Sequence, residues 1–250
     1  QDLILSLRGT FTYSHNEIVS MDEPKYKWAY QYKAGHPINS INCLIADGLY
    51  KDEEEIASSP KSVYATRYPL QPGDIKYRDL NNDDIIDDND KCWTGNPTVP
   101  EIIYGFGFSL KYKGFDCSAF FQGQGKVSII MYDAHPFSTK AKPGFGLVQW
   151  IADEHWSESN PDPAAKYPRL SSQWNEHNGQ ANTLYVRNGK MLRLKTVEIG
   201  YSYKMMRIYV SGTNLLTFAP FKYWDPEKGS GNGLSYPLQR TFNLGFQFNF

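Results

Sequence analysis

Residues 240–250 read Arg-Thr-Phe-Asn-Leu-Gly-Phe-Gln-Phe-Asn-Phe, with a large apolar side chain at every second position. Alternate side chains of a β-strand point to opposite faces, so this pattern predicts a strand with one apolar and one polar face. A strand this aromatic at an exposed sheet edge would tend to aggregate in water. Lipid on the apolar face and a neighbouring strand at the edge would remove that hazard, as in a closed transmembrane barrel. The last strand of a soluble sandwich is the alternative, and the aromatic content favours the barrel.

The bulk composition is compatible with a barrel and excludes other classes. A transmembrane helix needs about 20 consecutive apolar residues, and the chain has no such run. The mean hydropathy of -0.55 does not argue against a barrel, because alternation and long polar loops dilute the hydrophobicity of barrel strands. The net charge of -1 provides no basic stripe, so we expect no nucleic-acid partner.

Further alternating runs lie upstream, and their connections alternate between long and short. Strands are predicted near 2–14, 101–112, 115–123, 184–203, 207–218 and 239–250, and long loops at 15–100, 124–183 and 219–238. The apolar positions of the fourth strand change face near Lys195, which predicts a β-bulge. Outer-membrane barrels have short periplasmic turns and long extracellular loops, so we expect extracellular loops and a periplasmic C-terminus. Since the smallest such barrels have about eight strands, the chain is predicted to be a segment of a larger all-β transmembrane barrel.

Residues 79–90 place oxygen-bearing side chains at the spacing of an EF-hand-type calcium loop. The predicted ligands are the side chains of Asp79, Asn81, Asp83, Asp87 and Asp90 and the backbone carbonyl of Ile85. Asp84 stands where glycine is usual, and Asp90 replaces the usual glutamate. A solvated acidic turn is the alternative, but six aspartates in twelve residues would repel one another without a counter-ion. We therefore expect a structural Ca²⁺, with Mg²⁺ as the alternative ion.

Other chemistry-bearing residues give weaker signals. The histidines, His15, His36, His135, His155 and His177, are scattered, and no hydrolase motif appears, so no catalytic residue is predicted and the chain is not expected to be an enzyme. Trp150, Trp156 and Trp174 would either stack on a ligand or pack the second long loop together. Cys43, Cys92 and Cys117 fit no metal or redox spacing, and their odd number leaves at least one without an intrachain partner.

Several collinear motifs resemble the C-terminal part of the SusC/RagA-type TonB-linked outer-membrane transporters of Bacteroidetes. They include Gly35-His36-Pro37-Ile38-Asn39, Ile45-Ala46-Asp47-Gly48-Leu49, Pro72-Gly73-Asp74-Ile75-Lys76-Tyr77 and Tyr112-Lys113-Gly114-Phe115-Asp116. Phe120-Phe121-Gln122-Gly123, Leu192-Arg193-Leu194-Lys195 and Asn214-Leu215-Leu216-Thr217 continue the series. The order of these motifs makes the resemblance specific over nearly the whole chain.

The resemblance implies properties that the residues alone do not. Members form 22-stranded barrels closed by an N-terminal plug, and they import glycans or peptides together with a SusD-like surface lipoprotein and the TonB complex. The plug is absent from this sequence, which we interpret as one portion of a transporter. Phe246, Phe248 and Phe250 would form the signal read by the barrel-assembly machinery. The competing hypotheses are a soluble, calcium-stabilised β-domain that binds carbohydrate and a hydrolase with an unrecognised carboxylate pair.

Overall fold

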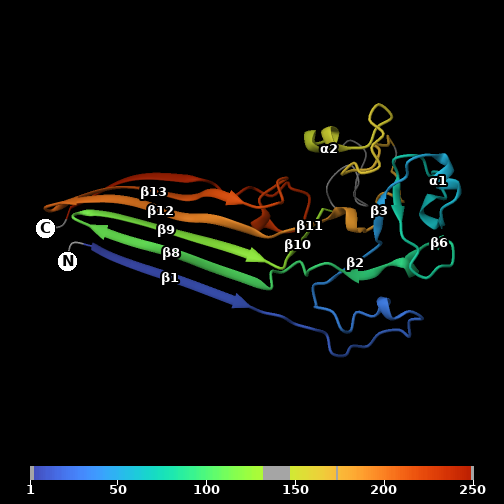
Figure 1. Cartoon of the computed structure of the whole chain (residues 1–250), viewed down its shortest axis with the longest axis horizontal. Helices are drawn as coiled ribbons and strands as arrows, with labels where there is room; N and C mark the ends of the chain where they lie inside the picture. The colour runs from blue at the N-terminus through green and yellow to red at the C-terminus, as the bar shows by residue number, and fades with distance from the viewer. Residues whose placement is uncertain (1–2, 132–146, 173, 249–250) are drawn as a thin grey trace.

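The computed structural model of the chain describes residues 3–131, 147–172 and 174–248. It has two parts, a long sheet at one end and a domain built from the loops at the other (Figure 1). Among the described residues, no helix is both long enough and apolar enough to cross a membrane.

The sheet contains six antiparallel strands in the order β1-β8-β9-β12-β13-β14. They are β1 (Leu3–Tyr13), β8 (Ile102–Tyr112), β9 (Phe115–Gly125), β12 (Met191–Tyr203), β13 (Met206–Phe218) and β14 (Thr241–Phe248). The sheet is open, with β1 and β14 at its edges. The predicted all-β fold is confirmed.

The fourth predicted strand, 184–203, is wrong in one respect. Residues Thr183–Tyr185 form a 3₁₀ turn, Val186–Asn188 form the short strand β11, and β12 begins only at Met191. Gly189 lies between the two strands. A side chain would not fit at this position, because its β-carbon would lie 2.9 Å from Cγ1 of Ile129. The predicted bulge near Lys195 is confirmed, since the register of β12 shifts between Leu194 and Thr196 against both neighbours.

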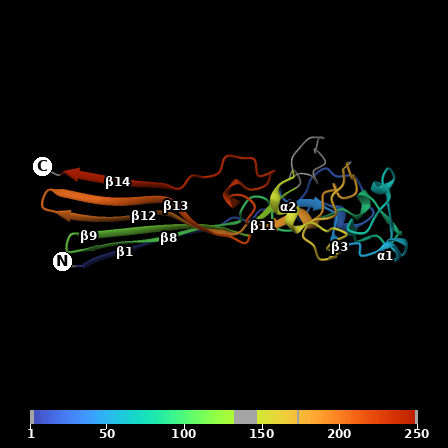
Figure 2. The same ribbon diagram turned by 90° about the horizontal axis from the view of Figure 1, so that it is seen from above.

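The connections sort to the two ends of the sheet (Figure 2). Tight turns join β8 to β9 and β12 to β13, and their residues Lys113 and Lys204 adopt positive φ angles of 44° and 51°. All the long connections leave from the opposite end and fold together there. The loop domain therefore lies beyond one rim of the sheet.

The predicted loops 15–100 and 124–183 contain much more structure than the sequence indicates. Short strands pair within this region: β2 (Ile41–Cys43) with β7 (Cys92–Thr94), β3 (Ala46–Leu49) with β5 (Ile75–Tyr77), β4 (Lys61–Ser62) with β6 (Ile85–Ile86), and β10 (Ser128–Ile130) with β11. Helices α1 (Glu53–Ala57) and α2 (Gln149–Glu154) and 3₁₀ turns at Ala29–Gln31, Val63–Ala65, Asp88–Asp90 and Pro226–Lys228 complete it. These strands have two to four residues, which is too short for an alternating pattern to be recognised.

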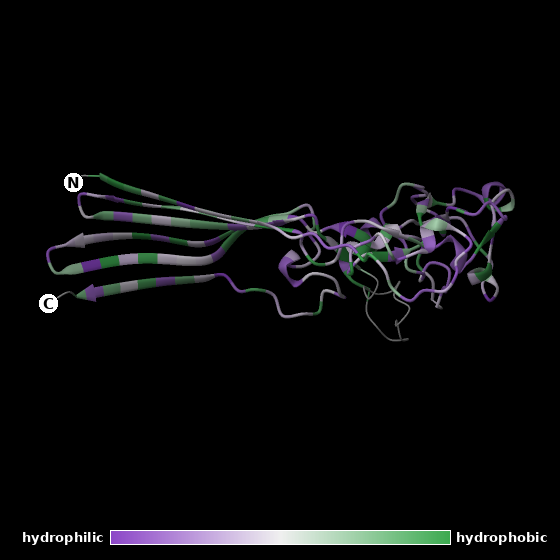
Figure 3. Cartoon of the chain, turned by 90° about the horizontal axis from the view of Figure 1, so that it is seen from below, coloured by the Kyte–Doolittle hydropathy of each residue, from purple (hydrophilic) through white to green (hydrophobic). Residues whose placement is uncertain are grey.

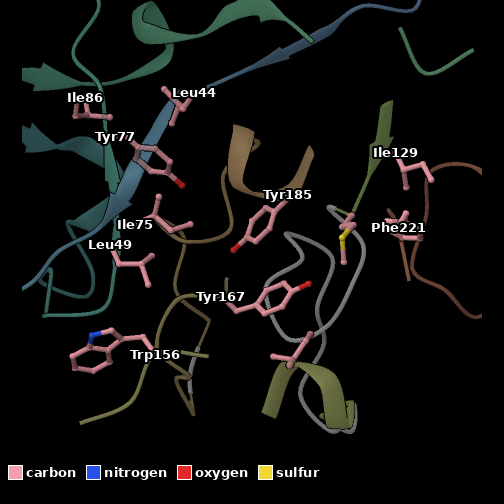
Figure 4. Close-up of a cluster of buried hydrophobic side chains, with 12 residues drawn as sticks. Leu44, Leu49, Ile75, Tyr77, Ile86, Ile129, Trp156, Tyr167, Tyr185 and Phe221 are labelled. Atoms are coloured by element: carbon pink, nitrogen blue, oxygen red, sulfur yellow. The ribbon is translucent and has the colours of Figure 1, made fainter. Parts of the chain in front are cut away.

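A hydrophobic core holds the loop domain together (Figure 4). Its members come from all three long connections: Leu44, Leu49, Ile75, Tyr77, Ile86, Ile129, Met131, Ile151, Trp156, Tyr167, Tyr185 and Phe221. Burying apolar surface of this extent against water is the main source of stability for such a unit. The loops thus form a packed domain of their own.

Arg193 joins this domain to the sheet. The side chain projects from β12 and is only 2% exposed, and its guanidinium pairs with Asp225 at 2.5 Å and with Glu227 at 3.1 Å. Lys195, at the bulge, reaches Glu227 at 2.8 Å. These ion pairs anchor residues 225–227 of the third loop on the polar face of β12.

Candidate functional site

One face of the six-stranded sheet is apolar from edge to edge. The register places Leu3, Leu5, Leu7, Phe11, Phe108, Leu110, Phe121, Ile199, Val210, Leu244, Phe246 and Phe248 on it. Many are largely exposed, including Leu7 at 76%, Phe11 at 70% and Phe246 at 60%. This face of the described strands carries no Asp, Glu, Lys or Arg. A continuous apolar surface far larger than a single patch marks contact with a nonpolar phase.

Tyrosines lie at the turn end of the apolar face. Tyr112, Tyr201 and Tyr203 are 44%, 38% and 62% exposed there. Aromatic side chains with a polar tip gather where hydrocarbon meets water in membrane proteins. Figure 3 shows hydrophobic and hydrophilic residues alternating along the strands that carry this surface.

The opposite face is polar, and it packs aromatic rings onto glycines. Phe120 lies on Gly107, and Tyr209 lies on Gly245; in each case the two residues are directly opposed across neighbouring strands. A β-carbon at Gly107 would lie 2.9 Å from Cδ2 of Phe120. Arg8 covers the Phe120 ring at 4.6 Å. Sequence reasoning missed these pairs, because each involves residues that are far apart along the chain.

A charged cluster occupies the turn end of the polar face. Arg207 on β13 donates to Asp116 of β9, with 3.0 Å between Nε and Oδ1, and to Glu198 of β12 at 2.6 Å. The neighbouring side chains, with Lys111 and Gln247, line a hollow of about 580 Å³. Polar groups of this density need water or protein opposite them, so this face cannot lie against lipid.

The predicted calcium loop is tightly wound in the structure. Both carboxylate oxygens of Asp79 accept from backbone amides, one from Asn81 and Asn82 and the other from Asp84 at 2.8 Å. Asp84 adopts a φ of 60°, the left-handed conformation for which glycine is usual at this position of an EF-hand-type loop. Asp83 accepts from the Ile85 amide, and Asp87 from the Asn89 amide. Among the described residues, no three His, Cys, Asp or Glu side chains converge as a metal site requires.

Asp90 is the most unusual member of this loop. It is fully buried, and its two oxygens accept from the amides of Leu80 at 2.8 Å and Asp87 at 2.9 Å. Burial raises the pKa of Asp90, and the charges of Asp79 and Asp87 add to that effect. Burial, together with the nearby carboxylates, also raises the pKa of Tyr30 to about 12. The loop therefore concentrates negative charge that the folded protein must stabilise.

A buried polar seam ties the first long loop to the second. Asp74, 1% exposed, accepts from the side-chain amides of Asn178 at 2.8 Å and Asn175 at 3.1 Å and pairs with Arg169 at 2.8 Å. His177 Nε2 lies 2.6 Å from the carbonyl oxygen of Ile75, so this nitrogen carries the proton. Burial lowers the pKa of His177, which is therefore neutral at pH 7.

The three predicted tryptophans do not come together. Trp156 is 6% exposed in the core, with its ring packed over Gly73. Trp174 packs over Gly179, while Trp150 contacts Tyr223 with 4.4 Å between ring centroids. The burial of Trp156 matches the packing interpretation, and Trp150 belongs to an aromatic cluster beside a hollow. His135 and Phe250 lie outside the described residues.

The hollow beside Trp150 lies where the second and third loops meet and measures about 440 Å³. Phe221 and Tyr223 form its aromatic wall, and Lys166, Arg187 and Lys222 bring positive charge. Lys166 pairs with Glu154, whose second oxygen accepts from the Tyr223 hydroxyl at 3.1 Å. Arg187 and Lys222 form no ion pair with any described residue. Within the described part of the chain, the hollow therefore combines an aromatic surface with two cations, Arg187 and Lys222, that have no ion-pair partner.

The cysteines are placed unexpectedly. Cys43 and Cys92, 49 positions apart, are direct register partners in the β2–β7 pair. They are 0% and 8% exposed. Cys117 lies far from them on the apolar face of β9, opposite Leu110 and Ile199. Sequence spacing could not reveal the first pair, because only the fold brings β2 and β7 together.

An apolar face, a polar face and a loop domain beyond one rim are together typical of the wall of a transmembrane β-barrel. Comparisons with known proteins agree. The chain is 34% identical to TonB-dependent receptor P26 of Formosa agariphila over 227 residues, which are 81% of the chain and 22% of that receptor. It is 30% identical to TonB-dependent receptor P3 of the same organism over 231 residues. No family model matches.

Solved structures show the same fold. The RagAB peptide importer in its open-open state matches with a TM-score of 0.68 and 21% identity. The match covers all of this chain and 27% of the importer chain. Its closed-closed state matches with a TM-score of 0.64. The chain therefore belongs to the TonB-dependent receptors, and its fold is that of the RagAB importer. It spans about a fifth of the length of the receptors P26 and P3.

Proposed function

We propose that this chain forms part of the barrel wall and the extracellular loop region of a TonB-dependent importer in the outer membrane. The apolar face would contact lipid, and the polar face would line the lumen. The tight turns and the C-terminus would lie on the periplasmic side, and the loop domain outside the cell. In this role the chain serves transport and carries no catalytic site.

One observation carries this proposal, the separation of the two faces across all six strands. A soluble carbohydrate-binding domain would have to cover an apolar surface of this extent with protein. A barrel wall leaves it in lipid and needs neighbours only at the β1 and β14 edges.

The partners of this barrel segment are proposed from the resemblance to SusC/RagA-type transporters. The inner charged cluster at Arg207 would face an N-terminal plug, through which the TonB complex acts. The loop domain would contact a SusD-like surface lipoprotein, and the imported ligand would be a glycan or a peptide. Support comes from the fold shared with the RagAB peptide importer, which extends over all of this chain and 27% of the importer chain.

The experiment that tests the function is cell fractionation followed by intact mass measurement of the native polypeptide. The proposal expects it in the detergent-extracted outer-membrane fraction, at a mass several times that of the 28.6 kDa segment. A 28.6 kDa protein in the soluble fraction would overturn it.

Ligand contact belongs, in this proposal, to the cationic and aromatic hollow at Arg187, Lys222 and Tyr223. Arg193 holds the loop that forms part of the hollow on the polar side of β12, near the mouth of the lumen. Aromatic rings pack against the apolar faces of sugars or side chains, and the cations favour a carboxylate on the ligand. An acidic oligosaccharide and a peptide with a free carboxylate share that chemistry.

The carboxylates of the acidic loop do not converge in the described structure, and we propose that they turn toward a common centre when Ca²⁺, or alternatively Mg²⁺, binds. Asp79, Asn81, Asp83, Asp87, Asp90 and the Ile85 carbonyl would supply the oxygen ligands that these ions prefer. The buried charge of Asp90 and the left-handed turn at Asp84 support this proposal. The ion would serve as a structural clip within the loop domain, since no transport step requires it.

A further inference from the structure

The Cys43–Cys92 register pair carries chemistry that the transport function does not use. Directly opposed residues of an antiparallel pair have Cα atoms about 4.5 or 5.5 Å apart, depending on the hydrogen-bonding position. Disulfides span Cα separations of about 4.4–6.8 Å. Both side chains must also lie on the same face of the strand pair. They do, because both are turned into the buried interior while Asn42 between Ile41 and Cys43 is exposed.

We propose that Cys43 and Cys92 form a structural disulfide in the mature protein. This inference rests on the proposed outer-membrane location, since the chain would then cross the periplasm, where disulfides form and persist. The oxidant would be the disulfide of a periplasmic thiol oxidase. One cysteine thiolate attacks that disulfide and releases one oxidant thiol. The second cysteine thiolate then attacks the mixed disulfide, so that two protons and two electrons leave the pair and the oxidant becomes a dithiol.

The order of events follows from burial. Burial raises the pKa of the Cys92 thiol, which makes it a poor nucleophile once the loop domain is folded. The bond would therefore form while β2 and β7 are still accessible, and afterwards it would resist exposed reductants. Cys117 has no such neighbour, because Leu110 and Ile199 face it across the adjacent strands.

The bond would close a long loop that contains α1, β3 to β6 and the acidic loop 79–90. Cross-links over long loops remove the most freedom from the unfolded chain. It would therefore stabilise the part of the loop domain that depends on the shortest strands. The disulfide would act as a clamp on the outer half of the molecule, with no role in the membrane sheet.

Peptide mapping of the full-length receptor tests the proposal. The receptor is extracted from outer membranes without reductant, denatured in N-ethylmaleimide and digested. We expect a peptide pair linked through Cys43 and Cys92, which separates after reduction, and an alkylated Cys117. Recovery of Cys43 and Cys92 as separate alkylated peptides would overturn the disulfide and leave the barrel proposal intact. Absence of the receptor from the outer membrane would instead overturn the proposed function.

A variant series gives an independent result. The double variant Cys43→Ser with Cys92→Ser should still assemble in the outer membrane, but protease should cleave residues 44–91 several-fold faster than in the parent. Cys117→Ser is the matched control and should leave the cleavage rate unchanged. Equal cleavage rates in the parent and the double variant would contradict a stabilising bond.

Discussion

At position 245 a β-carbon would lie 2.2 Å from Cζ of Tyr209, which is closer than two carbon atoms can approach. Gly245→Ala should therefore displace the Tyr209 ring from the polar face. Overpacking of this kind typically costs about 1–3 kcal/mol. Urea unfolding of the full-length receptor in detergent, followed by the gel shift of the folded barrel, measures the change. Gly9→Ala is the matched control, because its nearest neighbour is 3.8 Å away, and an equal loss in both variants would contradict this packing.

Lys222 tests the ligand proposal at the same scale. Its ammonium is exposed, so Lys222→Gln should leave folding unchanged while removing one positive charge from the hollow. We expect about three- to tenfold weaker binding of an oligogalacturonate or of a short peptide with a free carboxylate. A neutral oligosaccharide and the amide form of the peptide show whether binding needs the carboxylate of the ligand. Comparison of the oligogalacturonate with the acidic peptide shows which of the two ligand classes binds. The exposed Lys190→Gln is the control; equal affinities of Lys222→Gln and Lys190→Gln would argue against the hollow.

Single residues also show what the sequence reveals. The apolar positions of the terminal strand, including Phe246 and Phe248, could be predicted because alternation is a local property. The Tyr209–Gly245 and Cys43–Cys92 pairs could not, since each depends on which strands become neighbours. Trp156 illustrates the same limit, because its aromatic ring fits a binding surface or a core and only the fold buries it.

Among the elements, the buried seam around His177 should make the loop domain sensitive to pH. The pKa of His177 is lowered in the folded state, so the unfolded state binds more protons below about pH 6.5, its ordinary value. The stability that the neutral ring provides is complete above that pH and is lost as the pH falls. Limited proteolysis of the loops from pH 8 to 5 should show faster cleavage in acid for the parent than for His177→Gln. A parallel pH dependence in both proteins would show that another group is responsible.

The acidic loop is the element that a metal would stabilise. Asp79→Ala with Asp83→Ala removes two predicted ligands and also hydrogen bonds to the amides of Asp84 and Ile85. If the loop binds calcium, added Ca²⁺ should raise the midpoint of thermal unfolding of the parent but not of the double variant. The contrary outcome is a difference between the unfolding midpoints of the parent and the double variant that is the same in calcium and in chelator. That result would argue against a bound ion.

Element length decided how much of the fold could be predicted. The long strands of the sheet, 8 to 13 residues each, produce recognisable alternation. The loop domain is built from strands of two to four residues whose partners are distant, such as β3 and β5. Its core and its polar seam therefore emerged only from the three-dimensional structure.

At the scale of the whole molecule, the open sheet and the loop domain fit one wall segment of a closed barrel with a domain of loops beyond one rim. The β1 and β14 edges would pair with strands of the remaining barrel, which removes the aggregation hazard of exposed edges. The two faces of the sheet would then meet different surroundings, lipid outside and protein or water inside.

The most direct measurement of this claim compares assembly of Phe246→Asp with that of Asn243→Asp in the outer membrane. The two positions lie on the same strand, Phe246 on the apolar face opposite Ile208 and Asn243 on the polar face opposite Ser211. A lipid-facing charge costs up to a few kcal/mol near mid-membrane depth, whereas a lumen-facing charge costs little. The account predicts that Phe246→Asp abolishes the heat-modifiable folded barrel and Asn243→Asp assembles normally. Equal assembly of both variants, or soluble expression of Phe246→Asp, would contradict it.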